Sequence, residues 1–432
     1  MRNSTPLKEV KYHKKIEFIM SSDNLIGISG YSSKDSGFTG EIKYNADSFI
    51  VNEIPERMQK NQTGKYTILK IKLTNWDTNK FIIYLSDYLH ISNKRITYAG
   101  TKDKTGITTQ YFCINLPDDS INFKNINIKD AEFLDVFKSD HMLKLGDLRG
   151  NEFIIKIMSS KNNNDKILRI YNEIMNNGGF PNFFGYQRFG NIRVNTHRIG
   201  KLIVTGKYEE AVKLYLYDSE FDHEDYRINF DKTGDAKKAL SEFPSYLSFE
   251  RSLLGYILEH KTYANAFSIF PKNLSMLFVH AYQSYIFNRI LSERMKITDN
   301  LFQVMEGDCA LPLDEYFNPD KTEIIHATKY NLEKLNALSR NNKLRPAIPL
   351  IGYKSELSSG VEGEIENRIL ESENISRKNF YINGFKNLSS SGDFRIISAM
   401  PRNFNIVDEN TLKFELGKGI YAVSFLREFI KK

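Results

Sequence analysis

Apolar and polar residues alternate from Tyr66 to Leu73, and this alternation predicts a β-strand with one buried face. Lys70 and Lys72 fall on the face that would meet solvent. The opposite face carries Thr67, Leu69, Ile71 and Leu73. The pattern is therefore that of a half-buried strand.

A helical pattern follows this strand directly. Asp77 or Thr78 can act as the N-cap of a helix. Apolar residues then recur at helical spacing, at Phe81, Ile82, Leu85, Tyr88 and Leu89. Beyond the helix, a β-branched and aromatic run predicts another strand, Ile107 to Ile114. The expected order is strand, helix, loop and strand.

The loop ahead of the second strand concentrates charge around one carboxylate. Asp103 stands between Lys102 and Lys104, and the cluster is flanked by Gly100 and Gly106. Glycine adopts backbone angles that other residues avoid, so a tight loop is expected. The lysines favour the ionised form of Asp103, which suits chemistry on a polyanion. Taken alone, however, the pattern G-x-K-D-K is more often a solvated charged turn.

A second distinctive segment is NFFGYQRFG, from Asn182 to Gly190. It offers an aromatic ring, Phe184, close to the cation of Arg188. If the ring has an exposed edge, it could stack on the base of a nucleic acid. Aromatic residues in a core turn are the commoner alternative for such a segment.

The composition is that of a folded and slightly basic protein. The 432 residues suffice for two or three domains. Lys and Arg number 60 against 53 Asp and Glu, and the net charge of +7 fits binding to nucleic acid or another polyanion. The two cysteines, Cys113 and Cys309, have no close partner in sequence, so neither a disulfide framework nor a cysteine zinc site is expected.

Several signals of other protein classes are missing from the sequence. There is no apolar run long enough to cross a bilayer, and the N-terminal segment lacks the apolar stretch of a secretory signal. We therefore expect a cytoplasmic protein. The scattered histidines indicate no metal site, and neither a phosphate-binding P-loop nor a dinucleotide fingerprint occurs.

The remaining segments predict a mixture of helices and strands. Gly150-Asn151 is expected to form a turn that leads into a strand from Phe153 to Ile157. Charged helices are expected at Lys207–Leu216, Gly234–Leu240 and Gly363–Leu370. A longer helix is indicated by an apolar stripe at Phe278, Ala281, Tyr282, Tyr285 and Ile286. The C-terminal tail returns to strand patterning, with Arg395 in a strand.

These motifs together resemble the TruD family of pseudouridine synthases. GTKDK followed by TTQ is similar to the family's central motif, and NFFGYQRFG is similar to a second motif at every fixed position. The resemblance extends from about Leu25 to the end of the chain and is closer to archaeal members. Thr105 and Gly106 depart from the Arg-Ala that relatives often carry, and Ala46, Asp47 and Ser48 replace a Pro-Glu-Asp step.

The resemblance implies roles for individual residues. The aspartate of the central motif is catalytic in the family, so Asp103 would act as a nucleophile on C1′ or as a base at C2′. Lys43 matches a lysine near the active site, and Phe184 would stack on the base. Asn182 and Gln110 would supply hydrogen bonds. Contacts to phosphates, or support for the charge of Asp103, would come from Lys102, Lys104 and Arg188.

The resemblance also implies an α+β fold. It predicts a mixed, mainly antiparallel sheet in a catalytic domain of the pseudouridine-synthase type, interrupted by an inserted α/β domain, the family's TRUD domain. The catalytic domain would comprise residues 1–198 and 389–432, and the insertion would comprise residues 199–388. We expect the C-terminal tail to complete the sheet of the first domain.

The implied function is the isomerisation of uridine to pseudouridine in tRNA, at uridine-13 in the family. No cofactor and no metal would be needed. The expected partner is tRNA or another structured RNA. We expect the protein to be a monomer and not to associate with a membrane. A catalytically silent RNA-binding protein or chaperone of the same fold is one alternative, against which the intact Asp103 argues. A glycosidase-like hydrolase is another, but it would normally need two paired acids.

Overall fold

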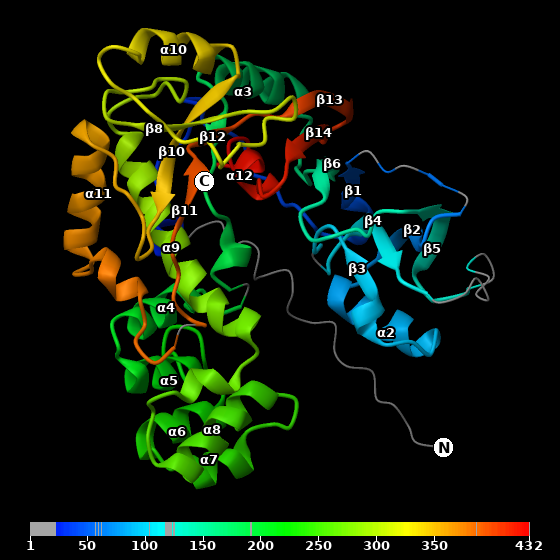
Figure 1. The fold of residues 1–432 in the computed structure, drawn as a ribbon, viewed down its shortest axis with the longest axis vertical. Coiled ribbons are helices and arrows are strands. Elements are labelled where there is room, and N and C mark those ends of the chain that lie inside the picture. Colours follow the sequence, from blue (N-terminus) through cyan, green and yellow to red (C-terminus); the bar gives the residue numbers. More distant parts are fainter. Residues whose placement is uncertain are drawn as a thin grey trace. The chain divides into compact units, whose positions relative to one another are not determined.

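The computed structural model describes residues 23–431 except 57, 59, 62, 103, 117–122, 124–125, 191 and 386. The chain divides into two compact units. The first, here called the helical unit, comprises Met1–Tyr31, Pro181–Pro312 and Lys321–Ser398. The second, here called the large-sheet unit, comprises Ser32–Phe180, Leu313–Asp320 and Ala399–Lys432. Figure 1 labels the elements of both units.

An eight-stranded sheet forms the centre of the large-sheet unit, as far as the residues are described. The strand order is β13-β14-β6-β1-β4-β2-β5, and β3 also pairs with β4. Among the described residues of this sheet, β1 and β4 pair in parallel and the other pairs are antiparallel. The strands are β1 (Phe49–Pro55), β2 (Tyr66–Thr74), β3 (Ile96–Tyr98), β4 (Ile107–Ile114), β5 (Ala131–Ser139), β6 (Leu148–Lys156), β13 (Arg402–Asp408) and β14 (Thr411–Gly417). The predicted α+β class with a mixed, mainly antiparallel sheet is confirmed.

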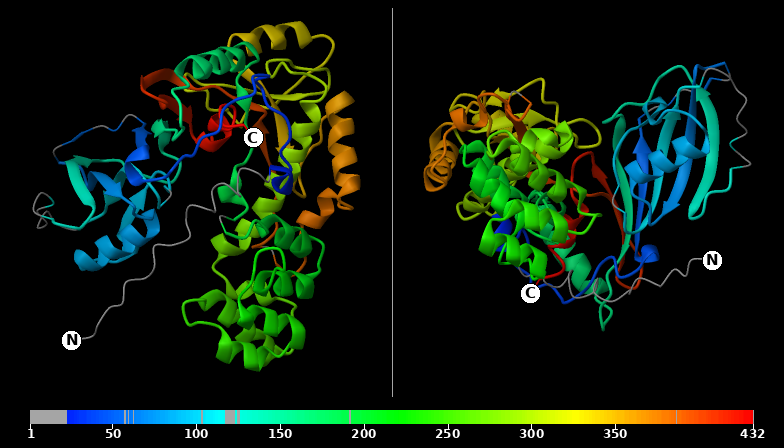
Figure 2. Two further views of the ribbon diagram at one scale, coloured as in Figure 1. Left: turned by 180° about the vertical axis from the view of Figure 1, so that it is seen from behind. Right: turned by 90° about the horizontal axis from the view of Figure 1, so that it is seen from below.

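Helix α2 (Thr78–Tyr88) covers one face of this sheet, as the right-hand view in Figure 2 shows. Asp77 is its N-cap, since its side chain accepts a hydrogen bond from the backbone of Lys80. Phe81 and Leu85 are completely buried against strand residues that include Leu69 and Ile71. The predicted strand, helix and following strand are all confirmed, because an alternating face and a helical stripe bury each other.

The edge of the sheet formed by β13 and β14 packs against α3 (Asn164–Asn176) and α12 (Ala422–Leu426). The ring of Tyr171 on α3 stacks on Phe404 of β13, with centroids 3.9 Å apart. Phe425 on α12 meets Phe414 of β14 at 4.8 Å. The unit also contains the 3-10 helices η2 (Ala46–Ser48) and η3 (Asn93–Arg95).

The predicted turn at Gly150-Asn151 is wrong. Both residues lie inside β6, where Gly150 pairs with Ile54 of β1 on one side and with Gly417 of β14 on the other. A Cβ atom on Gly150 would lie only 2.2 Å from the carbonyl oxygen of Leu416. This glycine therefore permits a close approach of two strands, which sequence patterning cannot distinguish from a turn.

The helical unit contains mostly helices, with α5–α8 gathered at one end of it (Figure 1). The helices are α4 (Thr196–Val204), α5 (Tyr208–Leu216), α6 (Asp225–Thr233), α7 (Ala236–Glu242), α8 (Ser248–His260), α9 (Lys272–Arg294), α10 (Leu332–Arg340) and α11 (Gly360–Ser372). Short 3-10 helices occur at η1 (Asp23–Ile26), η5 (Tyr186–Arg188), η6 (Ala266–Ile269) and η7 (Arg377–Phe380). The predicted charged helices are confirmed, with ends shifted by a few residues.

A four-stranded antiparallel sheet with the order β11-β10-β8-β9 completes this unit within the described residues. Its strands are β8 (Cys309–Pro312), β9 (Ile325–His326), β10 (Leu344–Leu350) and β11 (Asp393–Ile396). Separately, β7 (Phe180–Pro181) pairs with β12 (Ser398–Ala399). Helix α9 is buried around most of its circumference, and the predicted apolar stripe lies within it.

The tail divides between two sheets. Strands β13 and β14 join the large sheet as expected, through the pairing of β14 with β6. In contrast, β11, which carries Arg395, pairs with β10 of the helical unit. Only the last part of the tail therefore completes the large sheet, and the domain limits at 198/199 and 388/389 stay a prediction. In the part of the chain that the structure describes, no helix is long and apolar enough to span a membrane.

Candidate active site

The loop that carries the motif KDK is anchored by a buried ion pair. Asp103 itself lies outside the described residues, but both of its neighbours are described. The ammonium of Lys102 lies 2.7 Å from a carboxylate oxygen of Glu53 on β1. The side chains of Lys102 and Glu53 are only 7% and 0% exposed. Lys102 is thus directed into the protein, which favours a positioning role over a contact with RNA phosphate.

Two opposing effects set the protonation of Glu53. Burial raises the pKa of Glu53 above its ordinary value of 4.5, because the charged carboxylate loses water. The charge of Lys102 and its hydrogen bond act in the opposite direction, as does the backbone N–H of Tyr111, which donates to Glu53 at 3.4 Å. Each charge of the pair therefore needs the other, because either one alone would be buried without compensation.

The backbone of the loop is also held in place. The N–H of Lys102 donates to the hydroxyl of Thr78, at the start of α2, over 2.9 Å. That hydroxyl lies 3.3 Å from both amide atoms of Gln110 on β4, and Gln110 is completely buried. Gln110 was predicted to offer a hydrogen bond to substrate. Its position instead fits support of the loop, through Thr78.

The end of the loop passes very close to β1. Gly106 has a φ of +126°, and a Cβ atom there would lie 2.5 Å from the carbonyl oxygen of Phe49. Its N–H donates to the side chain of Asn75 at 3.2 Å, and its carbonyl accepts from the N–H of Asn75 at 2.9 Å. Glycine is therefore required where the loop turns into β4.

The two other lysines of the predicted site differ in exposure. Lys104 is exposed, so it can meet a polyanion in solution. Lys43 is half-buried, has a left-handed backbone with φ of 59°, and places its ammonium 4.3 Å from the ring centroid of Phe49. Since the carbonyl of Phe49 adjoins Gly106, Lys43 and the loop share one neighbour.

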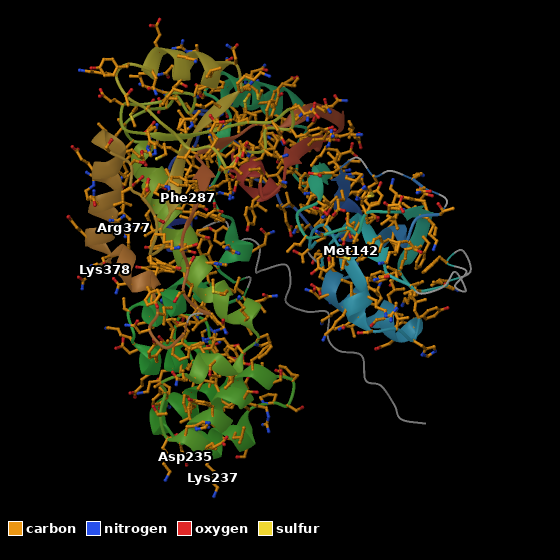
Figure 3. All side chains as sticks on the ribbon, in the orientation of Figure 1. Met142, Asp235, Lys237, Phe287, Arg377 and Lys378 are labelled. Atoms are coloured by element: carbon orange, nitrogen blue, oxygen red, sulfur yellow. The ribbon has the colours of Figure 1, made fainter. Side chains whose placement is uncertain are left out.

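The second group of predicted residues lies in the helical unit and centres on Phe184. This residue is 6% exposed. Asn288 of α9 fixes its backbone, because the Asn288 side chain accepts from the Phe184 N–H at 2.9 Å and donates to its carbonyl at 3.1 Å. Phe287, labelled in Figure 3, packs edge-on against the Phe184 ring at a centroid distance of 5.5 Å.

A guanidinium group covers the Phe184 ring. The central carbon of the Arg395 guanidinium lies 4.0 Å from the ring centroid. Arg395 donates through Nε to the carbonyl of Asn182 at 2.9 Å and through Nη2 to the Asn182 side chain. Asn182 is itself 1% exposed and donates to the carbonyl of Ile396 at 3.0 Å. Asn182 therefore holds Arg395 in place over the Phe184 ring.

Arg188 is half-buried and also lies near the Phe184 ring. Its Nε donates to the hydroxyl of Ser284 on α9 at 3.2 Å, and its guanidinium carbon is 5.7 Å from the Phe184 centroid. Phe184 thus has two guanidinium groups near its ring. Planar guanidinium groups can extend an aromatic surface on which a nucleobase stacks.

The structure therefore brings the predicted residues together as two groups, one in each unit. Lys43, Lys102, Lys104 and Gln110 belong to the large-sheet unit, and Asn182, Phe184 and Arg188 belong to the helical unit. Sequence reasoning gave Glu53, Thr78 and Arg395 no part in the active site. Each stands in or beside a segment that resembles the family, which was the available signal, but burial and pairing partners are tertiary properties.

No group of three His, Cys, Asp or Glu side chains that could hold a metal ion occurs within the described residues. What the arrangement supplies is a loop with fixed ends on both sides of Asp103, exposed basic charge at Lys104, and an aromatic ring with two guanidinium groups. These are the parts that chemistry on an RNA nucleotide requires.

Comparison with known proteins assigns the chain to one family. The family model described as tRNA pseudouridine synthase D (TruD) matches residues 25–429. The chain is 51% identical over 407 residues to a probable tRNA pseudouridine synthase D of Picrophilus torridus, covering 94% of this chain and 97% of the relative. A protein of the same name from Thermoplasma volcanium is 49% identical, with 89% and 93% of the two chains covered.

A solved structure gives the same assignment. The crystal structure from Methanosarcina mazei that carries the name tRNA pseudouridine synthase D (TruD) superposes with a TM-score of 0.79 at 34% identity. The match covers 94% of this chain and 97% of that one. Sequence, fold and motif order agree over nearly the whole length, and the chain belongs to the tRNA pseudouridine synthase D (TruD) family.

Proposed function

We propose that this protein isomerises uridine to pseudouridine in tRNA, at uridine-13, with Asp103 as the catalytic carboxylate. The observation that carries the proposal is the family match over residues 25–429, which includes the KDK loop. The relatives named above bear the name of this activity. The rigid attachment of the loop at Lys102 and Gly106 adds support, because a catalytic group must be held within a narrow range of positions.

The chemistry needs only one well-placed carboxylate and a pocket that retains the base. The N1–C1′ bond breaks, the uracil turns, and a C5–C1′ bond forms; C5 then loses its proton and N1 gains one. No atoms enter or leave, so no co-reactant is required. Asp103 either attacks C1′ as a nucleophile or removes a proton from C2′ as a base.

The surrounding residues divide the remaining tasks. Lys102 fixes the start of the catalytic loop through Glu53, and Gln110 supports the same position through Thr78. Exposed Lys104 contacts phosphate, and Lys43 adds positive charge beside the loop. In this proposal, these residues orient the carboxylate and attract the RNA, while Asp103 alone reacts.

The second group receives the extruded base. Phe184 supplies a ring, Arg395 and Arg188 extend it with guanidinium planes, and Asn182 holds Arg395 in register. Because Arg395 covers one part of the ring, the base would stack on the combined surface rather than on Phe184 alone. A catalytically silent RNA-binding protein of the same fold remains the second candidate, since it would use the same surface.

The test replaces Asp103 by Asn. The side chain is nearly isosteric, so tRNA binding should stay within about twofold while pseudouridine formation falls by about 10³-fold or more. Pseudouridine is measured by tritium release from tRNA labelled at uridine C5 and located by mass spectrometry after chemical derivatisation. Lys104→Gln serves as the matched control in the same loop, with weaker binding and an intact chemical step.

Two outcomes would contradict the proposal. Substantial turnover by Asp103→Asn would remove this residue from catalysis. A wild-type protein that binds tRNA tightly and forms no pseudouridine in any tRNA transcript would favour the silent RNA-binding protein.

A further inference from the structure

A polar cavity lies beside Arg188 within the helical unit. Its volume is about 350 Å³, which lies in the range of pockets that hold nucleotide-sized ligands. The wall includes the α9 residues Met276, His280 and Gln283 and the segment Ser389–Gly392. We refer to it as the Arg188 cavity.

The buried wall of the cavity has an unused hydrogen-bond acceptor. Gln283 is 4% exposed, and its Nε2 donates to the carbonyl of Ile351 at 2.7 Å and to the hydroxyl of Ser390 at 2.9 Å. A carbonyl can only accept, so this contact fixes which end of the amide is nitrogen. The Oε1 atom of Gln283 has no partner among the described residues, and it is available to a donor on a ligand.

The same wall has unused donors and a neutral ring. Arg188 uses Nε for Ser284, and neither of its Nη groups has a hydrogen-bond or ion-pair partner in the described part of the chain. Neither ring nitrogen of half-buried His280 has a described partner. Burial, and then the charge of Arg188, lower the pKa of His280 to about 4, so at neutral pH it offers one donor and one acceptor.

The charge around the cavity suits a phosphate. Asp393, the acidic residue in the wall, forms a salt bridge with Lys321, so its charge is compensated. Arg188 therefore gives the cavity a net positive group, next to neutral donors, acceptors and the apolar side chains of Met276 and Leu350. An anionic group linked to a planar, hydrogen-bonding ring matches this set of contacts.

We propose that the Arg188 cavity binds one unpaired nucleotide that flanks the target uridine, with its phosphate on Arg188 and its base against Gln283 and His280. The inference rests on the proposed function, because Arg188 also lies 5.7 Å from the Phe184 ring that would receive the target base. One arginine is thus shared by the two places, and the phosphate that joins two consecutive nucleotides would lie between them. The cavity would then select the RNA sequence beside the modified position.

The experiment closes the cavity from its rim. Ser391 lines the cavity and is exposed, and its side chain makes only a long contact of 3.5 Å to the carbonyl of Gly392 within the described residues. Its carbonyl accepts from the N–H of Lys354 at 3.1 Å, a backbone contact that Ser391→Trp keeps, so this variant should fold normally. We expect KM for tRNA to rise about tenfold, the value of one lost base contact, with kcat near wild type. Ser391→Ala keeps the cavity open and should behave as wild type. Ser252→Trp, at an exposed position of α8, controls for the added indole.

A second substrate makes the test specific. RNA with a single abasic nucleotide at each position around the target uridine should bind wild-type protein about tenfold more weakly at one flanking position. The Ser391→Trp variant should lose nothing further at that position, because the cavity is already closed.

Three results would overturn the inference. Ser391→Trp could have the wild-type KM. The variant and the abasic nucleotide could each weaken RNA binding independently of the other, or wild-type protein could bind equally well to RNA with an abasic nucleotide at any flanking position. In each case, wild-type pseudouridine formation would leave the proposed function standing. Absence of pseudouridine from wild-type reactions would instead remove the proposed function itself.

Discussion

The KDK loop of the large-sheet unit and the Phe184 segment of the helical unit are both held in place by buried polar groups, but with different chemistry. Lys102 is fixed by the carboxylate of Glu53, which is completely buried. Phe184 is fixed by neutral amides, directly by Asn288 and through Arg395 by Asn182. A buried ion pair fails when one partner is lost or changes protonation, whereas an amide works at any pH. The position of the KDK loop therefore depends on both partners of the ion pair and on pH, whereas that of Phe184 does not.

The largest effect should come from breaking the ion pair. Lys102→Met leaves Glu53 buried without a cation, and we expect the free energy of unfolding to fall by about 3–5 kcal/mol, together with a loss of turnover. Thermal melting and tritium release on one preparation measure both. Lys104→Met is the matched control, because this neighbouring lysine is exposed and should cost almost no stability.

A double variant sharpens this test. Adding Glu53→Gln to Lys102→Met removes the uncompensated carboxylate and should restore most of the stability but not the turnover. If the double variant is no more stable than Lys102→Met, the ion pair is not the cause of the loss.

Truncating the aromatic ring should have the next largest effect. Phe184→Ala should cost about 3 kcal/mol of stability, because the side chain is buried, and should also lower turnover at a temperature where the variant is folded. Phe184→Tyr should keep much of the activity. Phe189→Ala removes a fully buried ring from the same segment and should lose stability alone. Equal activity of the two alanine variants would make Phe184 a core residue only.

Loss of the Gln110 amide that supports the KDK loop should have a moderate effect. Gln110→Leu leaves the Thr78 hydroxyl without its amide partner. We expect the free energy of unfolding to fall by about 1–2 kcal/mol, and kcat to decrease by the factor that corresponds to a similar energy. Chemical denaturation and single-turnover kinetics measure the two. A loss of tRNA affinity with unchanged single-turnover rate would instead assign Gln110 to substrate binding, as the sequence predicted.

The smallest effect should be a pH dependence of the stability that Glu53 contributes beside the loop. The pKa of Glu53 is raised, so folding favours its protonated form; this contribution is complete below its ordinary value of 4.5 and is lost as pH rises through the raised value. The stability of wild type relative to Glu53→Gln should therefore decrease with pH over that interval. Denaturation at several pH values measures the difference in free energy of unfolding between wild type and Glu53→Gln. If this difference does not change with pH, Lys102 cancels the effect of burial on Glu53 entirely.

Much of the local structure was predictable from sequence patterning. The strand β2, the helix α2 and the strand β4 follow from alternation and a helical stripe, since these periods directly reflect which side chains can be buried together. Gly150 shows the limit of that reasoning. Its role depends on Leu416, which lies more than 260 positions further along the chain, and no local pattern contains that contact.

The candidate residues divide in the same way. The motif resemblance was enough to select Asp103, Phe184 and their neighbours, because residue type and spacing are properties of the chain itself. Which lysine is open to solvent was decided by tertiary structure: Lys104 is exposed, while adjacent Lys102 is turned inward to Glu53. Adjacent lysines have equal chemistry until folding removes water from one of them, and the partner that compensates this loss comes from another strand.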